Sequence, residues 1–131
     1  MKLSDEDRAI LVKREYEKAQ TFMLQAEGNI QLGYWDTVAN RLYYSVFHAI
    51  SALLIHDGHQ VGTHKGSVMR FGQYYVKTGI FSSDEGALYS RLETMREKAD
   101  YEVTFTASKT AINEMYPQSK ALLEKIAMFI R

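Results

Sequence analysis

The stretch from Asn40 to His48 places a cation and an imidazole among apolar and aromatic side chains. Arg41 and His48 are seven positions apart, or two helical turns, so both project from one face of a helix, roughly 10 Å apart along its axis. An imidazole can move a proton near neutral pH, and a guanidinium can stabilise the charge of a phosphorane. The pair is therefore a candidate catalytic site, and RNA cleavage by 2′-hydroxyl attack is one reaction that these two groups could carry out.

A structural role for this pair is the alternative. Charged groups on an apolar face are costly to bury unless a partner or ligand meets them. Arg41 could pair with a carboxylate, Asp36 or Asp100, and His48 could be a hydrogen-bonded core or interface residue.

The segment from Gly62 to Ser67 is suited to binding phosphate. It combines glycine freedom, backbone N–H groups ahead of a helix and two basic side chains, His64 and Lys65. Its spacing and the lack of a preceding strand exclude a Walker loop. The alternative is a surface loop in which Thr63 or Ser67 caps the following helix.

Arg96, Asp100 and Tyr101 come near one face of a later helix. The simplest outcome is an ion pair between Arg96 and Asp100, at positions i and i+4, with no chemistry. The functional alternative is that Arg96 and Tyr101 line a nucleotide-binding groove beside Arg41.

A metal site is not expected. Three histidines and an aspartate lie close together in sequence between residues 56 and 64 and suggest a metal site. However, no two histidines lie four apart on a helix, and metal sites need fixed ligand geometry. We interpret them as solvent-exposed loop residues, and we expect no cofactor: His56, Asp57, His59 and His64.

Five helices are predicted to position these side chains. A single proline and only 8 glycines favour long helices over many turns, and no segment has the pattern of a strand. The first helix shows one sustained apolar stripe and the second shows two, so the second should lie at the centre. The expected helices cover about 4–32, 34 or 36 to 56, 67–77, 82 or 83 to a break at 102–106, and 107–130.

These helices predict an all-α, up-and-down bundle in one domain over residues 1–131. We expect a kink in the last helix near Pro117; the alternative is two short helices that meet at Tyr116. Small residues at Ser45, Ala49 and Ala52 would let a neighbouring helix approach the second closely.

The overall composition argues against several classes of function. Sixteen basic and 16 acidic residues balance, which argues against a broad nucleic-acid-binding surface but not against a small basic site. No cysteine is present, the first residues are unlike a signal peptide, and no apolar run approaches the roughly 20 residues that a membrane helix needs. We therefore expect a cytoplasmic protein that does not enter a membrane.

The aromatic clusters around Tyr43 and Tyr75 are interpreted as core and dimer interface.

Several strings occur in an order that resembles one family. Gly33-Tyr34-Trp35-Asp36 leads into the stretch from Asn40, and then come Thr63-His64-Lys65-Gly66, Tyr75-Val76-Lys77-Thr78-Gly79 and Arg96-Glu97-Lys98-Ala99-Asp100-Tyr101. Over most of its length the chain resembles the HEPN domain (higher eukaryote and prokaryote nucleotide-binding), in particular its small stand-alone prokaryotic branch.

The resemblance implies a helical bundle that forms homodimers. It implies a partner, a minimal nucleotidyltransferase, in some cases within a toxin–antitoxin pair, and a nucleotide or RNA ligand. It also makes modification of Tyr101 by such a partner conceivable.

Active members of the family are metal-independent endoribonucleases with an arginine and a histidine that face their dimer mates. Arg41 and His48 match that pattern with six intervening residues. In many members the motif lies in a later helix, where this chain keeps Arg96 but offers no histidine. On that alignment the protein binds a nucleotide or RNA without cleaving it; a purely structural interaction module is the third hypothesis.

Overall fold

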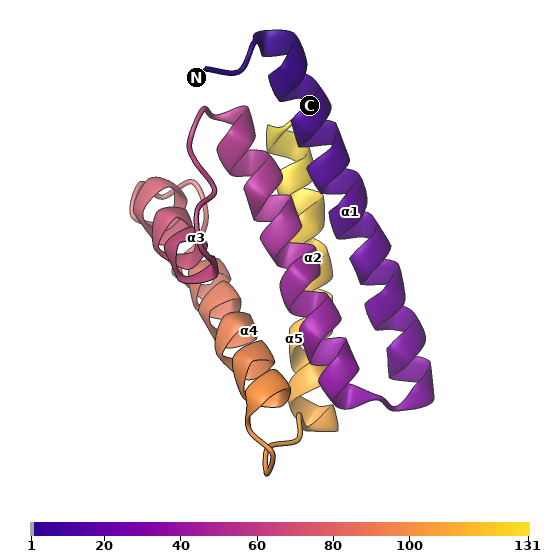
Figure 1. The fold of residues 1–131 in the computed structure, drawn as a ribbon. Coiled ribbons are helices and arrows are strands. Elements are labelled where there is room, and N and C mark those ends of the chain that lie inside the picture. The colour runs from indigo at the N-terminus through magenta and orange to yellow at the C-terminus, as the bar shows by residue number, and fades with distance from the viewer. Residues whose placement is uncertain (1) are drawn as a thin grey trace.

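Helices dominate the fold of residues 2–131, which a computed structural model describes. Figure 1 shows α1, α2 and α5 side by side, with α4 beside α2 and with α3 and the short helix η1 above α4. The chain runs down α1, up α2, down α4 and up α5, so the predicted all-α, up-and-down bundle is confirmed. The elements are α1 (Asp5–Leu32), α2 (Trp35–His56), α3 (His64–Phe71), η1 (Gly72–Val76), α4 (Ser83–Tyr101) and α5 (Lys109–Phe129).

Short polar residues set the helix starts. The Ser4 hydroxyl accepts a hydrogen bond from Asp7 N–H at the start of α1, and the Ser108 hydroxyl accepts one from Ala111 N–H at the start of α5. Ser82 and Glu85 form a reciprocal capping box at the start of α4. These caps satisfy N–H groups that have no partner within the helix.

Helix α2 is the centre of the bundle. Its two apolar stripes are buried, and the Ser45 hydroxyl donates a 2.7 Å hydrogen bond to the Ala19 carbonyl of α1, so these two helices approach closely. The expectation that no segment is apolar enough to cross a membrane needs correction, because α2 is long enough and an 18-residue stretch of it has a mean hydropathy of 1.2. However, 67% of this 18-residue stretch is buried inside the bundle, as expected for a core helix.

The third helix differs from the prediction. It begins at His64 rather than near Ser67, because the Thr63 hydroxyl caps it by accepting from Gly66 N–H at 3.0 Å. After Phe71 the backbone widens into the π-helical turn η1, which had no signal in the sequence.

Pro117 lies inside α5, and the helix continues through it. The alternative of two short helices that meet at Tyr116 is therefore wrong. The kink near Pro117 stays a prediction.

Candidate functional site

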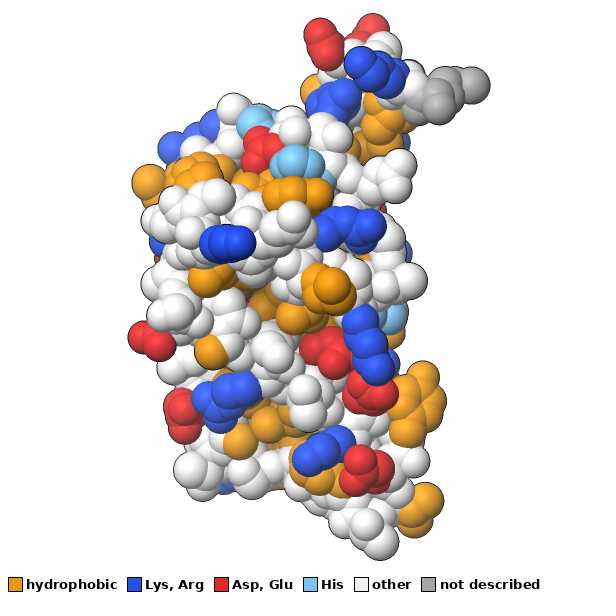
Figure 2. Space-filling model, turned by 90° about the vertical axis from the view of Figure 1, so that its left-hand side faces the viewer, with side chains coloured by type: hydrophobic (Ala, Val, Ile, Leu, Met, Phe, Trp, Pro, Cys, Tyr) orange, Lys and Arg blue, Asp and Glu red, His pale blue; other side chains and the backbone are white. Residues whose placement is uncertain are grey.

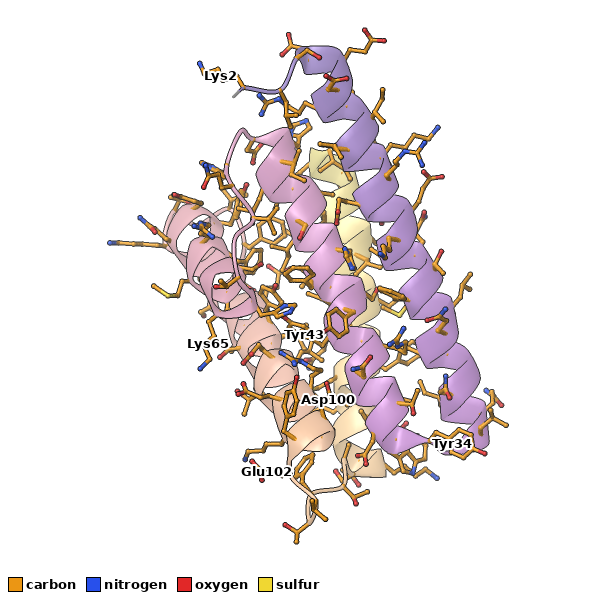
Figure 3. All side chains as sticks on the ribbon, viewed as in Figure 1. Lys2, Tyr34, Tyr43, Lys65, Asp100 and Glu102 are labelled. Atoms are coloured by element: carbon orange, nitrogen blue, oxygen red, sulfur yellow. The ribbon has the colours of Figure 1, made fainter. Side chains whose placement is uncertain are left out.

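A cavity of about 390 Å³ lies where the start of α3 faces the second half of α4. Figure 3 shows Tyr43 and Asp100 on the side of α4 that faces α2, and Lys65 at the outer edge of α3. The cavity gathers all four residues predicted to bind nucleotide or phosphate. It is lined by Thr63, His64, Lys65, Glu93, Arg96, Glu97 and Tyr101.

Arg96 is the deepest charge of this cavity and is only 5% exposed. Its Nη2 lies 3.4 Å from Glu93 Oε1, and its Nη1 lies 3.7 Å from Asp100 Oδ2, so the expected pair with Asp100 is present. The guanidinium carbon sits 4.8 Å from the ring centre of Tyr43 and 5.8 Å from that of Tyr44. Its Nε has no hydrogen-bond partner within residues 2–131. A buried cation thus keeps an unused donor with no accessible surface, which costs free energy.

His64 stands at the first turn of α3, with its ring fixed by α2. Its Nδ1 makes a 2.7 Å hydrogen bond with the Tyr43 hydroxyl, and its ring centre is 4.8 Å from that of Phe47. Burial, and then the charges of Arg96 and His48, lower the pKa of His64, so the neutral imidazole is favoured. No hydrogen bond among the described residues engages its Nε2, which is therefore open to a ligand.

The anchor of His64 is itself rigidly held. Tyr43 is fully buried, and its ring stacks against Tyr89 at a centre distance of 6.1 Å. The Tyr89 hydroxyl in turn shares a 2.7 Å hydrogen bond with the buried Ser67 hydroxyl, so Ser67 is a core residue and Thr63 alone caps α3. Burial raises the pKa of both tyrosines, which keeps them neutral.

Carboxylates offset part of the positive charge. Burial, and then the charge of Glu97, raise the pKa of Glu93 above its ordinary range, although Arg96 acts in the opposite direction. Figure 2 shows positive and negative side chains interspersed over the face formed by α3 and α4. The basic character of the cavity is therefore local to Arg96, His64 and Lys65.

Tyr101 forms the outer wall of the cavity. It is 75% exposed, as the last residue of α4. An exposed ring beside a cavity with basic side chains offers a surface on which a nucleobase can stack.

Arg41 and His48 lie elsewhere, on the side of α2 that faces α1. The Phe22 ring lies between them, 4.8 Å from the Arg41 guanidinium carbon and 5.4 Å from the His48 ring centre. Arg41 donates to Asn40 Oδ1 and to Gln25 Oε1, and His48 Nδ1 is 2.7 Å from Glu15 Oε2. The expected common face is present. Arg41 has amide partners, so the alternative of a carboxylate partner is wrong.

The carboxylates considered for Arg41 serve other groups. Asp36 accepts from Ala107 N–H at 2.6 Å, and Asp100 accepts from the Asn40 side-chain amide. Arg41 lines a separate, smaller cavity of about 290 Å³ together with Asp36, Thr37, Asn40 and Asp100. A single groove shared by Arg41, His64 and Arg96 is therefore not formed.

The histidines that suggested a metal site diverge in the fold. His56 pairs with Asp57 at 2.9 Å, His59 stacks on Tyr74 at 4.0 Å, and His64 faces Tyr43. Within residues 2–131 no group of three metal-ligating side chains converges.

Sequence reasoning missed Tyr43 as the anchor of His64 and Glu93 as a partner of Arg96. Glu93 had a usable signal, because it lies three residues before Arg96 on the same helix. Tyr43 had none, since it lies 21 residues before His64 and on another helix.

Comparison with known proteins identifies the class. A model of the HEPN domain matches residues 12–128, which is most of the chain. The protein therefore belongs to the HEPN domain family, as its motifs indicated.

Three relatives show the extent of the similarity. A protein of Methanocaldococcus jannaschii named "Putative toxin" is 32% identical over 102 residues, which cover 72% of this chain and 75% of the relative. A UPF0332 protein of Thermotoga maritima is 28% identical over 94 residues, with 72% and 71% covered. A UPF0332 protein of Archaeoglobus fulgidus is 25% identical over 108 residues, which cover 82% of this chain and 86% of the relative.

Proposed function

We propose that the cavity around Arg96 binds the phosphate of a nucleotide or of an RNA strand. The observation that carries this proposal is that one cavity is lined by the buried Arg96 guanidinium together with His64 and Lys65. His64 and Lys65 at the start of α3 add a second donor and a second cation, and Tyr101 adds a stacking surface. Phosphate would sit at the helix start, where the backbone dipole favours an anion.

The test measures the affinity of labelled single-stranded RNA of randomised sequence, and of labelled ATP, by fluorescence anisotropy. Lys65→Met should weaken binding and lower its salt dependence, because one contact to phosphate is lost. Tyr101→Ala should cost about 1–3 kcal/mol of binding if a base stacks there. Lys98→Met is the matched control, because Lys98 is a lysine of α4 that lies outside the cavity. Equal affinity in all four proteins would contradict the proposal.

We further propose that the protein acts as a homodimeric partner module of a minimal nucleotidyltransferase in a cytoplasmic toxin–antitoxin pair. The HEPN membership and the toxin name of a relative support this role. Exposed apolar residues along α1 offer contact area for assembly: Ile10, Leu11, Leu24 and Leu32. Light scattering of the purified protein tests the dimer, and co-purification with the product of an adjacent nucleotidyltransferase gene tests the partner. A monomer that retains no such product would contradict both.

A second candidate is a metal-independent endoribonuclease that uses Arg41 and His48 across a homodimer. It is favoured by their common face on either side of Phe22 and by Glu15, which can orient the His48 imidazole. Its test is RNA cleavage in EDTA by wild type and by folded Arg41→Ala and His48→Ala variants. Full activity in both variants would exclude it, and a purely structural role would instead lower stability or assembly.

A further inference from the structure

The two walls of the cavity between α3 and α4 differ in charge. The wall from α3 carries His64 and Lys65, which can both donate to phosphate, at the start of that helix. The wall from α4 carries two carboxyl groups, those of Glu93 and Glu97, beside the single buried cation Arg96. A phosphate is therefore favoured near α3, where the helix start also attracts an anion, and the base of a nucleotide is left nearer α4.

The two carboxyl groups of the α4 wall are not equivalent. Glu93 is only 9% exposed, and its Oε1 lies 3.4 Å from Arg96 Nη2, so its charge is engaged within the protein. Glu97 is exposed, and no cation among residues 2–131 forms an ion pair with it. Glu97 is therefore the carboxylate of the cavity that remains able to accept hydrogen bonds from a ligand.

Glu97 and Tyr101 are four residues apart on α4, so their side chains are neighbours on the helix face that lines the cavity. A base stacked on the exposed Tyr101 ring lies parallel to that ring, and a carboxylate one helical turn away can reach the edge of the base. We propose that Glu97 selects guanine, by accepting hydrogen bonds from its N1–H and its 2-amino group. The inference rests on the nucleotide or RNA binding proposed above and names the base.

The hydrogen-bonding edges of the four bases make guanine the match for a carboxylate. A carboxylate only accepts hydrogen bonds, so both of its oxygens are used when two N–H donors lie side by side. Guanine presents N1–H beside its 2-amino group. Adenine and cytosine present an amino group beside a ring nitrogen whose lone pair repels the carboxylate, and uracil presents one N–H between two carbonyl oxygens. Guanine alone therefore satisfies both oxygens of Glu97.

The experiment measures base preference in two arms with the full chain. Isothermal titration calorimetry compares GMP, IMP and AMP, which share the ribose and the phosphate; IMP keeps N1–H but lacks the 2-amino group. Fluorescence anisotropy compares two labelled oligouridylates, one with a single guanosine and one with a single adenosine. The two arms distinguish a free guanine nucleotide from a guanine within RNA.

We expect wild type to bind GMP roughly tenfold or more tightly than AMP, with IMP between them, as for other bidentate base contacts. Glu97→Gln presents one acceptor and one donor, which match the amino group and N1 of adenine, so the preference should shift toward AMP. The ratio of the two affinities is the readout, because loss of a negative charge strengthens the binding of any phosphate.

Glu124→Gln is the matched control. Glu124 is an exposed glutamate of α5 that lies outside the cavity, so its substitution removes the same charge and should leave the ratio of GMP to AMP affinity unchanged.

The outcomes separate this inference from the proposed function. Equal affinity of wild type for guanine and adenine ligands in both arms would overturn the inference and leave the proposed binding intact. A guanine preference that persists unchanged in folded Glu97→Gln would also overturn it, because another group would then recognise the base. Wild type that binds no ligand of either arm would overturn the inference and the proposed function together. A guanine preference in one arm only, lost in Glu97→Gln, would support the inference and identify the source of the guanine.

Discussion

The molecule has two arginine–histidine pairs, Arg41 with His48 and Arg96 with His64, on opposite sides of α2. They differ in how many of their polar atoms find hydrogen-bond partners within the protein. On the side toward α1, Arg41 donates to two amide oxygens and His48 pairs with Glu15. On the side toward α4, the Arg96 Nε is buried without a hydrogen-bond partner among the described residues, and His64, like His48, is bonded through Nδ1 only.

In the first network the charged groups all have hydrogen-bond partners, whereas in the second a buried donor of Arg96 has none. Arg41 is joined to neutral groups near the surface, so little is lost if it is removed. Arg96 is buried against two carboxylates and two aromatic rings, so its removal leaves charges without a partner. Variants of these two sides should therefore separate in both stability and ligand binding.

The largest expected effect is that of Arg96→Ala. We expect the free energy of unfolding to fall by about 3 kcal/mol or more, because Glu93 is left buried without its cation and the rings of Tyr43 and Tyr44 lose their contact. Urea unfolding followed by circular dichroism measures the change. Adding Glu93→Gln should restore part of the loss by removing the unpaired charge. An effect no larger than that of Arg41→Ala would refute the contrast between the two sides.

A smaller effect is expected when the shared tyrosine loses its hydroxyl. Tyr43→Phe keeps the ring beneath Arg96 but removes the hydrogen bond to His64, which should cost about 1–2 kcal/mol. Tyr44→Phe is the matched control, since its hydroxyl makes no hydrogen bond among the described residues and its loss should cost less than about 0.5 kcal/mol. Equal losses of unfolding free energy in Tyr43→Phe and Tyr44→Phe would show that the hydrogen bond from Tyr43 to His64 does not stabilise the fold.

The pH dependence of stability tests the environment of His64. Its pKa is lower in the folded than in the unfolded protein, so the unfolded state binds more protons as pH falls. The stability is therefore fully present above the unfolded value of about 6.5 and is lost as pH falls below it. His64→Asn should flatten the stability curve in this window. An unchanged slope in urea unfolding across that window would mean that the ring is not held neutral.

The fold was largely predictable because its signals are local. Ser4, Gly33 and Ser82 mark helix ends through caps that depend on a few neighbouring residues, and the two stripes of α2 require burial on two sides. The start of α3 was misplaced by three residues, because a cap at Thr63 and a cap at Ser67 read alike in sequence. Only the buried bond from Ser67 to Tyr89 decides between them.

The candidate site was predictable in its parts but not in its assembly. His64, Lys65, Arg96 and Tyr101 could be chosen by chemistry, but their separation from Arg41 depends on how α2 is rotated toward α1. The bond from Tyr43 to His64 depends on side-chain rotamers across two helices, which no spacing encodes. The partners of Arg41 were mispredicted for the same reason, because Asp36 and Asp100 are used by Ala107 and Asn40.

The smallest effect is expected on the side toward α1. Arg41→Ala removes hydrogen bonds to Asn40 and Gln25, which water can replace, and a contact with the Phe22 ring worth about 0.5–1 kcal/mol. We therefore expect a loss of about 1 kcal/mol or less in urea unfolding at high protein concentration. If a second copy covers this face, the loss should grow as the protein is diluted, because dimer stability depends on concentration. A loss of several kcal/mol at every concentration would instead place Arg41 among the core charges and remove the contrast with Arg96.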